Sequence, residues 1–131
     1  MAEITAYAKE EKYLVQIESI SGNEIISDQK NDNEGNDLGL DPKELLAASL
    51  AACTNVTIRM YTTHKGWKLD DLKVNVNLDY DKGNNLTKIN TTLEFAGDLD
   101  EKQKTRILSV AKSCPVHKIL TNPVEIETTL L

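Results

Sequence analysis

Two cysteines, Cys53 and Cys114, are the residues of this sequence best suited to chemistry. A cysteine attacks other molecules as its thiolate, so the environment of each thiol decides whether it reacts. Cys53 lies in an apolar, alanine-rich run, where burial is expected to raise the thiol pKa. Cys114 directly precedes Pro115, at the break between two predicted helices. As the N-cap of the second helix it would lie at a positive helix end, which lowers a thiol pKa.

The composition is typical of a globular protein and excludes several function classes. The chain has 131 residues, 40% of them hydrophobic and 27% charged, which predicts one domain over residues 1–131 with a real core. A net charge of −6 argues against nucleic-acid binding, because phosphate contacts need clustered Lys and Arg. The sequence contains no signal peptide and no apolar run near the roughly 20 residues that cross a membrane. The prediction is a cytoplasmic protein, where two cysteines are more often reactive or simply buried than a permanent disulfide.

The pattern of apolar residues predicts an α+β fold. Alternation of apolar and polar residues predicts strands in six segments, namely residues 4–8, 13–17, 24–27, 72–80, 89–95 and 124–128. Helical spacing predicts three helices: residues 42–64, a segment that begins after Asp98 or Asp100 and leads to Cys114, and residues 115–120. We expect an N-terminal antiparallel sheet of three strands, a later hairpin and a closing strand at the end.

The first predicted helix is the central element of the expected core. Asp41 as N-cap, Pro42 at the first position and Glu44 three residues after the cap form a capping-box signature. Few charges follow until Arg59, so this helix is expected to be buried nearly all round. The polar stretch before it, residues 28–41, is predicted to be a solvated loop.

The order of these elements and the two cysteine motifs resemble the OsmC/Ohr family of thiol-dependent peroxidases. The likeness is carried by residues 41–54, DPKELLAASLAACT, and by residues 113–120, SCPVHKIL. It implies an OsmC-like fold over nearly the whole chain and an intertwined homodimer with the long helices at its centre. It also implies that Cys53 attacks an organic hydroperoxide and that Cys114 resolves the sulfenic acid as a disulfide. The implied reductant is a dithiol, of the lipoyl or another small-molecule kind, and no cofactor is expected.

The sequence departs from the family pattern in one respect, which indicates a divergent branch. Those enzymes use an Arg ahead of the long helix, held by a Glu ten positions before the first cysteine. Here no Arg precedes Arg59, and the position ten before Cys53 is Lys43. Glu44 is the nearest carboxylate, and Lys43 or Glu44 would be supporting residues of the site. Lys30, Lys43 or His64 would supply a positive charge, but none has the two-pronged grip of a guanidinium.

Other interpretations of the same residues stay open. The thiols could simply be buried, in a binding module that holds an apolar small molecule, or they could exchange disulfides without any preference for peroxides. Metal binding is a weaker interpretation. The loop at residues 28–41 lacks the ligand spacing of an EF-hand. Cys53 and His64 lie about 16 Å apart along one helix, too far for a single zinc ion. A zinc site of Cys53, Cys114 and His117 is a minor alternative, and no metal is expected.

Overall fold

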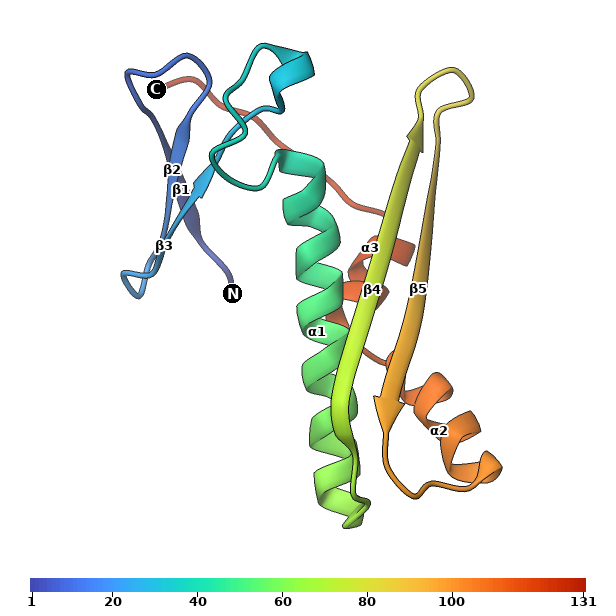
Figure 1. Cartoon of the computed structure of the whole chain (residues 1–131). Coiled ribbons are helices and arrows are strands. Elements are labelled where there is room, and N and C mark those ends of the chain that lie inside the picture. Colours follow the sequence, from blue (N-terminus) through green and yellow to red (C-terminus); the bar gives the residue numbers. More distant parts are fainter. The chain divides into compact units, whose positions relative to one another are not determined.

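The alternating segments at the start of the chain form a three-stranded antiparallel sheet, as predicted. Its strands are β1 (Ile4–Ala8), β2 (Val15–Ser19) and β3 (Glu24–Ser27), with β2 between the other two. The computed structural model describes residues 1–131, which divide into two compact units, Met1–Leu46 and Ala47–Leu131 (Figure 1). The sheet lies in the first unit. That the two units form a single domain stays a prediction.

The polar loop after β3 is more ordered than the solvated loop that the sequence predicts. It contains a short 3-10 helix, η1 (Asn31–Asn33), and the carboxylate of Asp28 is buried inside it, with only 2% of the residue exposed. This carboxylate accepts hydrogen bonds from three backbone N–H groups of the loop, those of Gln29, Asn36 and Leu38. A buried carboxylate requires such partners, and the loop wraps around it to supply them.

The long helix α1 (Pro42–Lys65) confirms the predicted helix and its capping box. The Asp41 carboxylate accepts the N–H of Glu44 at 2.8 Å, and the Glu44 carboxylate accepts the N–H of Asp41 at 3.0 Å. The prediction that α1 is buried nearly all round is wrong. Only one side is fully buried, through residues spaced four apart: Leu50, Thr54, Ile58 and Thr62. On another side of the helix Met60 is 68% exposed.

The hairpin and the second helix complete the core of the Ala47–Leu131 unit. Strands β4 (Asp70–Asp81) and β5 (Leu86–Ala96) pair in antiparallel register, as predicted (Figure 1). Helix α2 (Glu101–Ala111) has Asp100 as its N-cap, the second of the two aspartates after which a helix was expected to begin. The core lies between α1, the hairpin and α2, where Ile58, Leu99 and Ile107 form a buried cluster.

The end of the chain departs from the prediction in one element. Helix α3 (Pro115–Thr121) follows Cys114 as expected. The predicted closing strand at residues 124–128 is wrong, since residues 123–131 form no regular secondary structure. A strand needs a partner strand for its backbone hydrogen bonds, and β4 and β5 pair only with each other. No helix of the structure combines the length and apolar character needed to span a membrane.

Candidate functional site

The fold brings the two cysteines of the chain together. Cys53 is on α1, Cys114 immediately precedes α3, and both belong to the Ala47–Leu131 unit. Both are free thiols, and their side chains form a hydrogen bond with each other. Two sulfurs at hydrogen-bonding distance are close enough for a modest movement to join them as a disulfide. The resemblance implied such a pair, but the spacing along the chain alone did not.

Cys114 is completely buried and is the N-cap of α3. Its sulfur accepts the backbone N–H of His117 at 3.4 Å, and Pro115 occupies the first helical position, where a missing N–H costs nothing. Burial raises the pKa of the Cys114 thiol, and the hydrogen bond with Cys53 raises it further. The N–H groups of α3 act in the opposite direction but do not outweigh these two effects. The helix end therefore lowers the pKa of Cys114 as expected, but burial and the contact with Cys53 make the net shift upward.

For Cys53 the hydrogen bonds outweigh burial, so the net shift of its pKa is opposite to that of Cys114. It is half-buried, and this burial by itself raises the pKa of the thiol. Three hydrogen bonds outweigh the burial and lower the pKa below its ordinary value: one from the Cys114 side chain, one from the backbone N–H of Val116 and one from the Thr57 side chain. Burial thus raises the pKa of Cys53 as expected, but the net shift is downward because other parts of the fold, including an N–H group of α3, donate to this sulfur. A hydrogen bond to the charged form of an acid stabilises that form.

The pKa shifts of the two thiols are opposite in direction. Cys53 is therefore the thiol that ionises more easily, and Cys114 the one that holds its proton more tightly. Since the thiolate is the nucleophilic form, Cys53 is the better nucleophile. Its partial exposure also gives it better access to solvent than Cys114 has.

Two of the donors to Cys53 were not identified from the sequence. Thr57 lies four residues after Cys53 on α1, and residues at this spacing are neighbours on a helix surface. That spacing is a usable signal, because a hydroxyl one turn away from a thiol can donate to it. Val116 carries no signal in its side chain. Its backbone N–H is free to act because the first N–H groups of a helix have no partner within the helix.

The predicted supporting residues, Lys43 and Glu44, lie in the first turn of α1 and belong to the Met1–Leu46 unit. Glu44 forms an ion pair of 2.6 Å with Lys30, whose amino group also contacts the Asp37 carboxylate at 2.8 Å. The hydrogen bonds to Asp37 and then to Glu44 raise the pKa of Lys30. The Lys30 amino group, followed by the backbone N–H of Asp41, lowers the pKa of Glu44. The N-terminal unit therefore holds a lysine cation beside the first turn of α1.

A cavity of about 270 Å³ lies beside α3. It is bounded by α1, β5 and α3, and its lining includes His117, the residue whose N–H donates to Cys114. The other lining residues are apolar side chains and threonines: Leu50, Thr87, Ile89, Thr91, Leu120 and Thr121. His117 is half-buried at the edge of this cavity.

No group of three or more metal-binding side chains comes together in the structure.

Comparisons with known proteins agree with the architecture. A family model described as OsmC-like protein matches residues 34–129. No curated protein matches the sequence. An OsmC like protein from Mycoplasma pneumoniae is 25% identical with a TM-score of 0.78, over 92% of this chain and 86% of that chain. The organic hydroperoxide resistance protein OhrB of Bacillus subtilis is 24% identical with a TM-score of 0.62, over 92% of this chain and 90% of that chain.

Replacing Thr57 by Val removes one of the hydrogen bonds that stabilise the Cys53 thiolate while keeping the shape of the side chain. We expect the pKa of Cys53 to rise, so that alkylation by iodoacetamide at neutral pH becomes slower and its pH profile moves to higher pH. Mass spectrometry of the peptide that contains Cys53 measures this rate. Thr63→Val is the matched control, because Thr63 is an exposed threonine of the same helix. An unchanged profile in Thr57→Val, or an equal shift in both variants, would contradict the assignment.

Proposed function

Because the chain belongs to the OsmC-like protein family, we propose that it is a thiol-dependent reductase of organic hydroperoxides. In this proposal Cys53 attacks the peroxide and Cys114 resolves the product. The observation that carries it is the hydrogen-bonded thiol pair, in which the pKa of the more exposed Cys53 is lowered and that of the buried Cys114 is raised. A peroxidatic thiol must be ionised and must have a second thiol close by to escape over-oxidation.

The first step is attack of the Cys53 thiolate on the terminal oxygen of the hydroperoxide. A sulfur–oxygen bond forms, the oxygen–oxygen bond breaks, and the departing alkoxide takes the proton that Cys114 holds. The products are an alcohol, a sulfenic acid on Cys53 and a thiolate on Cys114. The hydrogen bond between the thiols supports this step, because it keeps the required proton next to the reacting sulfur.

In the second step the new Cys114 thiolate attacks the sulfenic sulfur of Cys53. A disulfide forms and hydroxide departs, which takes a proton from solvent. A dithiol of the lipoyl or another small-molecule kind then reduces the disulfide by thiol exchange. The identity of this reductant and the cytoplasmic location expected from the sequence stay predictions.

The class of substrate is proposed from two observations. The similar structure from Bacillus subtilis is named an organic hydroperoxide resistance protein, and so is one from Legionella pneumophila. The Legionella protein is 19% identical with a TM-score of 0.67, over 92% of this chain and 89% of that chain. The cavity beside α3 has an apolar part formed by Leu50, Ile89 and Leu120. An apolar cavity of this kind suits the organic portion of a hydroperoxide better than it suits hydrogen peroxide.

We assign the supporting residues of the first unit to holding a cation. Glu44 positions Lys30 through the 2.6 Å ion pair, and Lys43 adds a second positive charge in the same turn of α1 as Glu44. All the groups that lower the pKa of Cys53 within the chain are hydrogen-bond donors. That Lys43 and Glu44 support the reaction of Cys53 stays a prediction of the resemblance.

A homodimer is the assembly we propose, on the basis of unpaired apolar surface. Val124 and Ile126, which alternate with Glu125 and Glu127, are 60% and 82% exposed, and residues 123–131 have no strand partner in their own chain. The hairpin of β4 and β5 has two unpaired edges, and a lone hairpin is marginally stable. A second copy of the chain would supply partners for both the hairpin and the C-terminal segment.

The peroxidase proposal predicts the fate of each thiol on addition of cumene hydroperoxide. Wild type should lose both thiols stoichiometrically as one disulfide. Cys53→Ser should react only at the background rate of an ordinary buried thiol, a loss of at least tenfold. Cys114→Ser should lose the Cys53 thiol once and accumulate sulfenic and then sulfinic acid. Titration of thiols and intact-mass spectrometry measure these products.

The alternative functions give different results in the same experiment. No thiol loss in wild type would overturn catalysis and favour a binding module. Loss only through Cys114 would reverse the two roles. Exchange with a small-molecule disulfide that is fast and independent of peroxide would indicate a thiol transferase.

The dimer predicts that wild type sediments at twice the mass of the chain. Ile126→Asp places a charge on the proposed pairing face, so we expect at least tenfold weaker association. Glu127→Gln, on the other face of the same segment, is the matched control and should leave association unchanged. Sedimentation equilibrium measures both. A monomeric wild type, or equal association of the two variants, would contradict the proposed assembly.

A further inference from the structure

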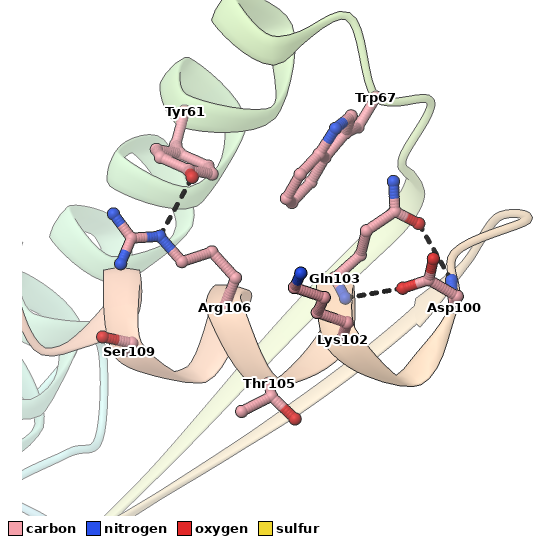
Figure 2. A pocket seen from close by; sticks show the side chains of 8 residues that line it. All are labelled: Tyr61, Trp67, Asp100, Lys102, Gln103, Thr105, Arg106 and Ser109. Atoms are coloured by element: carbon pink, nitrogen blue, oxygen red, sulfur yellow. Dashed lines mark hydrogen bonds between the residues drawn. The ribbon is translucent and has the colours of Figure 1, made fainter.

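A second pocket lies at the other end of α1 from its N-terminal caps. It is formed by the last turns of α1, the turn that leads into β4, and the outer face of α2, and its volume is about 420 Å³ (Figure 2). This is within the range of roughly 300–1,000 Å³ that is typical of small-molecule sites. Tyr61 lies eight residues after Cys53 on α1, about 12 Å along the helix axis. The pocket is therefore separate from the thiol pair.

Two aromatic rings form one wall of this pocket. Tyr61 and Trp67 meet edge to face, with ring centroids 5.5 Å apart and an angle of 77° between the planes. Trp67 also packs against the buried core residues Ile58, Leu99 and Ile107, which hold its ring in place. Both rings are half-buried, so each keeps part of its surface open to the pocket. The wall is rigid, apolar and suited to contact with another planar ring.

The charged groups of the pocket favour an anion. Arg106 donates a hydrogen bond from Nε to the Tyr61 hydroxyl at 3.0 Å, and its guanidinium lies 5.5 Å from the centre of the Tyr61 ring (Figure 2). This contact fixes the Arg106 side chain through Nε. The two Nη groups take no part in it and form no ion pair in the chain, so they can bind a ligand. Lys102 adds a second cation to the lining.

The one carboxylate of the lining does not neutralise these cations. Asp100 accepts the N–H of Gln103 at 2.8 Å in the capping box of α2, and Figure 2 shows the two residues bonded to each other beside Trp67. With two cations and one anion, the pocket is net positive in a chain whose net charge is −6. A second negative charge on a ligand would meet the Asp100 carboxylate, so a monoanion fits better than a dianion.

We propose that this pocket binds a small aromatic carboxylate. The ring of the ligand lies against Trp67 and Tyr61, and its carboxylate accepts paired hydrogen bonds from the Nη groups of Arg106. A planar guanidinium matches the two oxygens of a carboxylate. Such binding is independent of the proposed reaction at Cys53 and would give the protein a second ligand.

Benzoate is the probe that tests the site, and Trp67 is the reporter. It is the single tryptophan of the chain, so its indole N–H gives one signal in a proton–nitrogen correlation spectrum. We expect a saturable shift of this signal with benzoate, and at least tenfold weaker binding of benzamide, which lacks the charge, and of acetate, which lacks the ring. Arg106→Gln should weaken benzoate binding at least tenfold, and Arg106→Lys should weaken it less.

Lys104→Gln is the matched control, because Lys104 is an exposed cation of α2 that does not line this pocket. It should bind benzoate like wild type. The proposal is overturned if benzoate leaves the Trp67 signal unmoved, if benzamide binds as well as benzoate, or if folded Arg106→Gln or Arg106→Lys retains full affinity. Thiol loss with cumene hydroperoxide should be the same in wild type and Arg106→Gln, so the two proposals fail or succeed separately.

Discussion

The hydrogen bond between Cys53 and Cys114 is the interaction on which the rest of the site depends. Two equivalent thiols would both be protonated at neutral pH, with pKa values near that of free cysteine. Here burial acts against ionisation of both thiols, and Cys114 is the more deeply buried of the two. Val116 and Thr57 donate to Cys53 and lower its pKa, whereas the donors to Cys114, His117 and Val116, do not offset its burial. This difference in pKa favours Cys53 as the attacking group and Cys114 as the holder of the proton.

The elements around the pair are arranged to maintain that difference. Helix α3 is short, and its first N–H groups point at sulfurs: that of His117 donates to Cys114, and that of Val116 lies against both Cys53 and Cys114. Pro115 starts this helix directly after Cys114, which fixes where those N–H groups lie. On the other side α1 contributes Cys53 and Thr57 from one face. The groups that shift the two pKa values in opposite directions therefore come from α1 and α3, and none of them is a charged side chain.

Much of the fold follows from local patterns in the sequence. The strands β1 to β5, the caps of α1 and α2, and the proline at the start of α3 are where alternation and capping residues predict them. Predictions failed where the outcome depends on what lies beside an element. The alternation at residues 124–128 is typical of a strand, yet the chain offers it no partner. The apolar residues of α1 indicated burial all round, yet Met60 is exposed.

At the site, too, the sequence identifies the residues but does not predict their environment. The motifs identify both cysteines, but the direction of each pKa shift depends on which N–H groups face which sulfur, and this is a property of three-dimensional packing. Sequence position correctly placed Cys114 at a favourable helix end and Cys53 in an unfavourable apolar environment. The net pKa shifts are nevertheless opposite to these local effects, because burial outweighs the helix end at Cys114 and the donors of Cys114, Val116 and Thr57 outweigh burial at Cys53. The pairing of Lys30 with Glu44 likewise depends on how the loop folds back on the start of α1.

The most direct test of this account is to titrate the two thiols individually. Carbon-13 labels at Cβ of both cysteines, assigned with Cys53→Ser and Cys114→Ser, allow the ionisation of each sulfur to be followed by NMR across the pH range in the wild-type protein. The account predicts that the Cys53 signal titrates below the ordinary pKa of a cysteine and the Cys114 signal above it. Titration of Cys114 first, or of both thiols together at the ordinary value, would contradict it.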